Sequence, residues 1–243
     1  MIFKALPKAK IAKIVKNLID FVAKIPNTLE LQISLCFHLI AWCTTEKRNY
    51  LKHRIEIRLA GLYYQAEKYT DGLKIIEPLL KEIRKADDKH LLVEIQLIES
   101  KIQHSLQNLA KAKASLTAAR ACANSIYCPP QLQADIDLMS GILNSQDKDY
   151  KTAYSYFYES FEAFNSMEDS RAILPLKYMI LSKIMTDMSD DVYSILNGKF
   201  GLKYMGSALQ TMKDITDAHS EKSLKKFQLA LNKHETGKIN IGC

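Results

Sequence analysis

The sequence has little of the two residue types that build tight turns. Its 243 residues include only 8 glycines and 6 prolines, which is too few for the many short hairpins of an all-β chain. Leu, Ala, Lys and Glu are abundant instead, and these residue types favour helices. The composition therefore predicts an all-α protein. Its length allows one or two domains, or a continuous array of repeats.

Long apolar runs are also missing. No stretch approaches the roughly 18 consecutive apolar residues of a membrane helix, and the start, MIFKALPKAK, has no apolar segment typical of a secretory signal. We therefore expect an intracellular, soluble chain with no membrane partner. The cysteines are odd in number and irregularly spaced, which predicts reduced thiols and no disulfides. They are Cys36, Cys43, Cys122, Cys128 and Cys243.

Motifs for catalysis, cofactors and metals are scarce. The 6 histidines form no His-Glu-x-x-His motif, and Cys128 has no histidine nearby in sequence that could lower its pKa. The stretch GLKYMGS, residues 201–207, has the glycine spacing of a phosphate loop without its lysine, so we interpret it as an ordinary loop. Cys36, His38 and Cys43 could share a metal, but core thiols are the simpler interpretation. We expect no catalytic, cofactor-binding or metal-binding residues.

Charge is unevenly distributed along the chain. Of a net charge of +7, the first 26 residues supply six lysines against one acid, whereas residues 147–191 hold nine acids against five basic residues. Such a basic segment can contact nucleic acid, anionic lipid or an acidic protein, or simply be solvated. With no interleaved aromatics and no recognition motif, we favour a protein partner and expect no nucleic acid. The proposed contact residues are Lys4, Lys8, Lys10, Lys13 and Lys16.

Apolar residues at steps of three and four predict a first helix over residues 11–25, ended by Pro26. Asn27 followed by Glu30 has the form of a capping box for a second, buried helix, LELQISLCFHLIAW. The same spacing in a later aromatic run indicates core packing rather than stacking on bases. The first stripe is Ile11, Ile14, Val15, Leu18, Val22 and Ile25, and the later one is Tyr154, Phe157, Phe161 and Phe164.

Small residues recur with a period of 40 to 41 residues, in pairs twelve residues apart. Two helices with their turns fill such a period, and small residues are expected where paired helices approach closely. The pattern predicts a right-handed, tetratricopeptide-like helical-repeat solenoid. The pairs are Ala60 with Gly72, Ser100 with Ala112, and Gly141 with Ala153.

Regular repetition fades after residue 165. We therefore predict a solenoid over residues 1–165, continuing helices over 166–232 and an irregular tail over 233–243. Within the solenoid, Pro129 forces Cys128 into an extended conformation, and Pro130 suits the first turn of the next helix. These prolines separate two successive repeats.

Several long stretches, in the same order, resemble a known family, the helical-repeat PCI subunits of the proteasome lid. They extend from residue 2 to about residue 231. The stretches are IFKALPKAK, DDKHLLVEIQLIESK, AKAKASLTAARACANSIYCPP, KTAYSYFYESFEAF, LKYMILSKIM and SLKKFQLAL.

This resemblance implies an architectural function without catalysis. Such subunits hold the lid and the ATPase ring on the core particle, so the implied partners are other lid subunits, the ATPase ring and the core-particle alpha ring, in the cytoplasm and nucleus. Family chains continue into a winged helix, whereas this sequence ends at HETGKINIGC, so we expect the winged helix to be absent. A signalosome or translation-initiation PCI subunit, a stand-alone binding module and an unrecognised enzyme remain alternatives.

Overall fold

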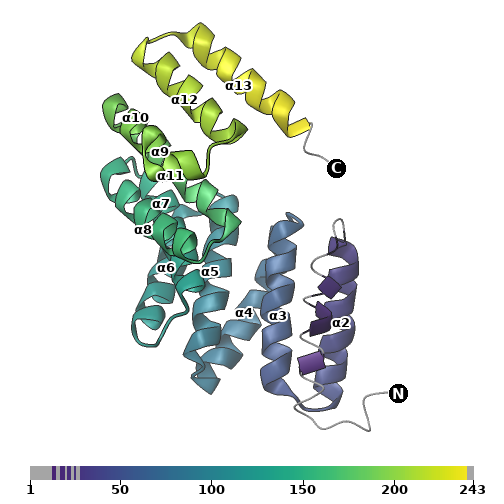
Figure 1. Cartoon of the computed structure of the whole chain (residues 1–243). Coiled ribbons are helices and arrows are strands. Elements are labelled where there is room, and N and C mark those ends of the chain that lie inside the picture. Colours follow the sequence, from purple (N-terminus) through teal and green to yellow (C-terminus); the bar gives the residue numbers. More distant parts are fainter. Residues whose placement is uncertain (1–12, 15–16, 20, 23–24, 26–27, 240–243) are drawn as a thin grey trace. The chain divides into compact units, whose positions relative to one another are not determined.

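A computed structural model describes residues 13–14, 17–19, 21–22, 25 and 28–239, and all its regular elements are helices (Figure 1). The all-α helical-repeat prediction is confirmed, while the handedness of the superhelix stays a prediction. The chain divides into two compact units, residues 1–128 and 129–243. The first unit contains α2 (Leu29–Thr45), α3 (Asn49–Gln65), α4 (Tyr69–Ala86), α5 (Lys89–Ser105) and α6 (Leu109–Asn124).

The second unit also consists of helices packed against their neighbours in sequence. Short links join them, and α7 packs against α8, α8 against α9, and α12 against α13. Its α7 begins at Pro130, as predicted from the two prolines. The elements are α7 (Pro130–Gln146), α8 (Tyr150–Ser166), the 3-10 turn η2 (Ser170–Ala172), α9 (Ile173–Met185), α10 (Ser189–Asn197), α11 (Lys199–Lys203), α12 (Ser207–Ser220) and α13 (Leu224–Ile239).

Each unit has its own apolar core. In the first unit, one buried cluster joins α2 to α3 and a second lies among α3, α4, α5 and their neighbours. In the second unit, Phe157, Phe161 and Phe164 are almost fully buried. This confirms that the stripe forms core rather than a surface for bases, because these three rings are inaccessible and Tyr154 is half-buried.

The loops within helical pairs share one geometry. Their middle residue has a positive φ, and the next backbone N–H bonds back to a carbonyl in the last turn of the preceding helix, as Asn108 N does to Gln103 O at 2.8 Å. This is the Schellman motif, which usually places glycine at the left-handed position. Here these positions fall 40, 41 and 39 residues apart, so the turns continue the repeat beyond residue 165. They are Glu67, Gln107, Lys148 and Asp187.

The N-terminal helix is packed differently from the prediction. Of the predicted apolar stripe, Ile14, Leu18 and Ile25 are exposed, whereas Ile19, outside that stripe, is buried against the cluster of α2 and α3. Val22 is half-buried, and Ile11 and Val15 lie outside the described residues. The described part of the stripe is therefore mostly exposed. The capping-box prediction is also wrong, because it placed the N-cap at Asn27. The N-cap of α2 is Thr28, and its side chain makes no capping hydrogen bond. Asn27 lies outside the described residues.

The predicted segment boundaries differ from those of the two units. The units meet between Cys128 and Pro129, and residue 165 lies near the end of α8. The helix α13 reaches Ile239, so the tail expected to be irregular from residue 233 is helical through residue 239. Lys and Glu in this stretch favour helix, which outweighs the single Gly237.

We expect Lys148→Gly to stabilise the protein by about 0.5–1 kcal/mol, because a residue with a side chain is strained at positive φ and glycine is not. Lys148 is exposed and its φ is 64°. The free energy of unfolding from urea titration measures the effect. Lys148→Ala is the control and should bring no such gain, since alanine keeps the Cβ. An equal gain from both substitutions would contradict the explanation.

Candidate functional site

The sequence predicted two kinds of functional residue: a basic partner-binding segment and the small residues of the repeat. Of the basic segment, Lys13 is described, and it is helical and exposed. Lys4, Lys8, Lys10 and Lys16 lie outside the described residues. Partner binding by these lysines therefore stays a prediction.

The first small pair lies between α3 and α4. Ala60 is fully buried, and a Cβ added to Gly72 would lie 4.0 Å from the Ala60 carbonyl oxygen and 3.0 Å from Cδ1 of Ile102 on α5. The space at Gly72 is therefore shared by three helices. A larger side chain there requires Ile102 to move.

The second pair, Ser100 and Ala112, is joined by a hydrogen bond. The Ser100 hydroxyl donates to the Ala112 carbonyl oxygen at 2.8 Å, in a buried position between α5 and α6. Serine is therefore suited to this position for its hydroxyl as well as for its size. A buried hydroxyl needs such a partner, because leaving it unpaired is costly.

The third pair, Gly141 and Ala153, lies between α7 and α8, where both residues are buried. An added Cβ on Gly141 would come within 2.5 to 2.9 Å of three ring atoms of Phe157. The Phe157 ring cannot easily move away, because it also stacks on Tyr178 of α9 with the ring centroids 5.1 Å apart. Gly141 therefore permits the close approach of α7 and α8.

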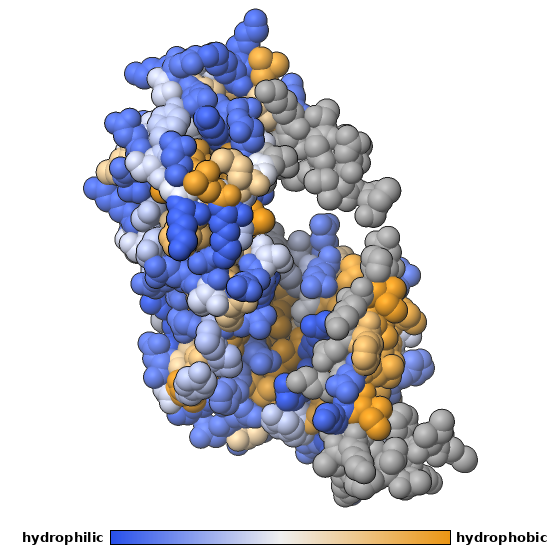
Figure 2. Space-filling model, in the orientation of Figure 1, coloured by the Kyte–Doolittle hydropathy of each residue, from blue (hydrophilic) through white to orange (hydrophobic). Residues whose placement is uncertain are grey.

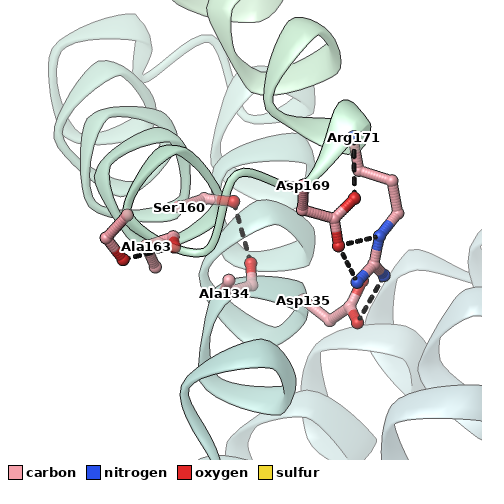
Figure 3. Close-up of polar contacts among 7 residues, drawn as sticks. Ala134, Asp135, Ser160, Ala163, Asp169 and Arg171 are labelled. Carbon is pink, nitrogen blue, oxygen red and sulfur yellow. Dashed lines mark hydrogen bonds and ion pairs between the residues drawn. The ribbon is translucent and has the colours of Figure 1, made fainter.

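The sequence did not predict that a buried serine hydrogen bond also joins α7 and α8. The Ser160 hydroxyl of α8 donates to the Ala134 carbonyl of α7 at 2.9 Å (Figure 3). It resembles the bond of Ser100, but the donor is on the second helix of the pair. Nothing in the local sequence distinguishes Ser160 from a solvent-facing serine.

An ionic contact lies beside this bond. The Arg171 guanidinium donates to both Asp169, at 2.7 Å, and Asp135 of α7, at 3.3 Å (Figure 3). Hydrogen bonds from Arg171 hold the pKa of the Asp169 carboxyl below its ordinary value. The guanidinium also lies over the Phe164 ring, 4.6 Å from its centroid. Arg171 therefore fixes the turn η2 to α7 and α8.

The thiols considered from sequence are poorly suited to chemistry. Burial raises the pKa of Cys36 to about 11 and also raises the pKa of Cys43, so neither forms a thiolate readily at neutral pH. His38 is exposed whereas both thiols are buried, so the three do not converge on a shared metal.

The glycines after α10 also have a structural explanation. A Cβ on Gly201 would lie 2.1 Å from the Leu196 carbonyl oxygen, so the chain can pass there only with glycine. Part of the stretch interpreted as a loop is the short helix α11. This close approach accounts for Gly201, whereas a Cβ on Gly206 would meet nothing nearer than the Tyr204 carbonyl oxygen at 3.9 Å.

One polar cluster was missed because the sequence search considered only paired histidines. His53 and Glu56 lie one turn apart on α3, and Nε2 of His53 is 3.1 Å from Oε2 of Glu82 on α4. Lys52 contacts both carboxylates, at 3.5 Å to Glu56 and 3.4 Å to Glu82. The His-x-x-Glu spacing was visible in the sequence, but the approach of Glu82 depends on the packing of α3 against α4.

Comparison with known proteins gives one consistent result. The family described as "26S proteasome regulatory subunit RPN6 N-terminal domain" matches residues 1–66. The "26S proteasome non-ATPase regulatory subunit 11 homolog" of Arabidopsis thaliana is 53% identical over 96% of this chain and 56% of its own length. The "26S proteasome regulatory subunit RPN6" of Saccharomyces cerevisiae is 48% identical over 94% of this chain and 54% of its own length.

This chain is a homologue of the RPN6 subunits. The chain spans about half the length of the curated relatives it matches. The match to the RPN6 N-terminal domain ends at Ala66, directly after α3, so it includes the basic segment, α2 and α3. The relatives match nearly the whole chain, so the resemblance noted in the sequence is confirmed in both units.

No described helix of this RPN6 homologue is both long and apolar enough to cross a membrane. The hydropathy of its surface is mixed, with apolar residues beside hydrophilic ones on the face shown in Figure 2. On α2, Leu31 and Phe37 are exposed. The basic segment thus precedes a helix that itself presents apolar side chains.

We expect Gly141→Ala to destabilise this homologue by about 1–3 kcal/mol, because the added methyl overpacks the contact with Phe157. Gly141→Leu should cost at least as much. Gly61→Ala is the matched control: it also lies within a helix, but its added Cβ would be 3.9 Å from the nearest atom, Cδ1 of Ile98. That control should be neutral or stabilising by up to about 1 kcal/mol.

Thermal and urea unfolding of the purified variants measure this difference. An unchanged stability of Gly141→Leu would show that the assigned helix register is wrong.

Proposed function

We propose that this chain is a non-catalytic scaffold subunit of the proteasome regulatory particle lid, and that it helps to hold the lid and the ATPase ring on the core particle during ubiquitin-dependent protein degradation. The main support is the similarity to RPN6 subunits at 48 to 53% identity over at least 94% of this chain. The relatives named here are regulatory subunits. The chain then acts by binding other proteins, in the cytoplasm and nucleus.

The architecture is consistent with this function. Paired helices with buried cores present long exposed faces, which suit binding between large proteins. Among the described cysteines, Cys36 and Cys43 have raised pKa values and are buried, unlike catalytic thiols. The proposed partners are other lid subunits, the ATPase ring and the core-particle alpha ring.

We propose that the basic segment contributes to the attachment. Six lysines and a single acid in 26 residues complement an acidic protein surface, and contacts between exposed charges weaken as salt rises. Lys13, the described member, is exposed and available for such contact. The segment belongs to the part that matches the RPN6 N-terminal domain.

Affinity purification of the tagged chain from cells, followed by mass spectrometry, tests the assignment. We expect subunits of the lid, the ATPase ring and the core particle in stoichiometric amounts. Recovery of signalosome or translation-initiation subunits in their place would contradict the proteasome assignment and support a related PCI complex. Recovery of none of these complexes would support a stand-alone binding module.

We expect joint replacement of Lys4, Lys8, Lys10, Lys13 and Lys16 by glutamine to weaken proteasome binding at low salt and to flatten its salt dependence. Each removed cationic contact removes part of the screened attraction. The control variant replaces five exposed lysines elsewhere: Lys68, Lys81, Lys85, Lys111 and Lys151. Binding measured from 50 to about 300 mM salt separates the two variants. An identical salt slope for the first variant and the unmodified chain would refute the role of the segment.

A further inference from the structure

The cluster of His53, Glu56 and Glu82 has the composition of a metal site. One ligand atom from each residue, an imidazole nitrogen or a carboxylate oxygen, lies within 4.8 Å of the other two. Imidazole and carboxylate are ligands that Zn²⁺ accepts. His53 is buried, and Glu56 is half-buried one turn further along the same helix face. Two ligands therefore stand on α3 and one on α4.

The cluster has an unbalanced charge. The ammonium of Lys52 faces two carboxylates, those of Glu56 and Glu82. Oε2 of Glu56 is buried and has no hydrogen-bond partner among the described residues. Burial raises the pKa of the Glu56 carboxyl above its ordinary value, as expected where charge is insufficiently compensated. A cation that reaches Oε2 of Glu56 supplies this oxygen with a partner and adds positive charge beside the carboxylates.

The geometry requires only a small adjustment to close around an ion. Tetrahedral Zn²⁺ with bonds of about 2.0–2.1 Å holds its ligand atoms about 3.4 Å apart, against a limit of 4.8 Å in the cluster. His53 and Glu82 already meet at 3.1 Å. The side chain of Glu82 is 51% exposed, so it can adjust its position and the cluster is open to an ion from solvent. A water molecule then supplies the fourth ligand.

The ammonium of Lys52 occupies the position that a metal ion would take between the two carboxylates. It lies 3.5 Å from Glu56 and 3.4 Å from Glu82, so a metal ion entering the cluster displaces it. The side chain is long and flexible and is 23% exposed, so its ammonium can turn towards solvent. Removal of this ammonium should therefore favour the ion, whereas removal of a structural salt bridge would only loosen the helices.

We propose that His53, Glu56 and Glu82 form a binding site for one divalent transition-metal ion, tested here as Zn²⁺, which replaces the ammonium of Lys52 and links α3 to α4. The site lies within the first unit and is independent of the proposed proteasome function. Its occupation fixes two helices together and stabilises that unit, because the ion binds the folded state alone. The role is structural, and no reaction is assigned to the ion.

Calorimetric titration of the full chain with zinc chloride tests the proposal, in a Cys128→Ser, Cys243→Ser background that removes a half-exposed and a terminal thiol. We expect one equivalent to bind and the unfolding temperature to rise with zinc. His53→Ala should weaken binding at least tenfold. His38→Ala, which removes an exposed histidine of α2, should leave it unchanged.

Two further variants address folding and mechanism. Glu82→Gln alters a half-exposed side chain, so it should preserve the fold and still weaken binding, whereas Glu77→Gln, an exposed control on the same helix, should not. Lys52→Met should strengthen binding severalfold. The proposal is overturned if zinc does not bind, if His38→Ala weakens binding as much as His53→Ala, or if Lys52→Met leaves the affinity unchanged or lowers it.

Discussion

Close approach between the two helices of a pair is the constraint on which both units depend. Gly141 leaves room for the Phe157 ring, and Ser100 brings α5 within hydrogen-bond distance of the Ala112 carbonyl. A bulkier residue at either position would separate the axes. The three-residue turns allow little compensation, because their backbone bonds fix where the second helix begins. The size of a few side chains therefore determines the spacing of long elements.

The sequence predicted the features that recur with a period. The spacing of Ala60, Ser100 and Gly141 placed small residues at helix pairs, and the stripe of Phe157, Phe161 and Phe164 predicted core because its period is that of one helix face. Composition sufficed for the all-α class. These signals are averages over many residues, so single exceptions do not remove them.

Features that depend on one contact could not be predicted in this way. Leu18 and Ile19 are adjacent and both apolar, and only packing against α2 and α3 decides that Ile19 is buried. The turn residue Lys148 has no local signature, because the glycine that would mark a left-handed position is missing. Glu82 meets His53 across 29 residues of sequence, a distance that no local pattern spans.

The division between Cys128 and Pro129 has a consequence for cooperativity. Each unit has buried apolar clusters composed of its own residues, and in helical arrays stability is approximately a sum over neighbouring elements. Sub-global opening is then the expected form of unfolding, with one unit exchanging its amide hydrogens while the other stays protected. One unfolding transition for each unit is then expected, and a substitution or a bound ion changes the transition of the unit that contains it. We then expect each half to have its own stability, so that proteolysis can remove one unit without unfolding of the other.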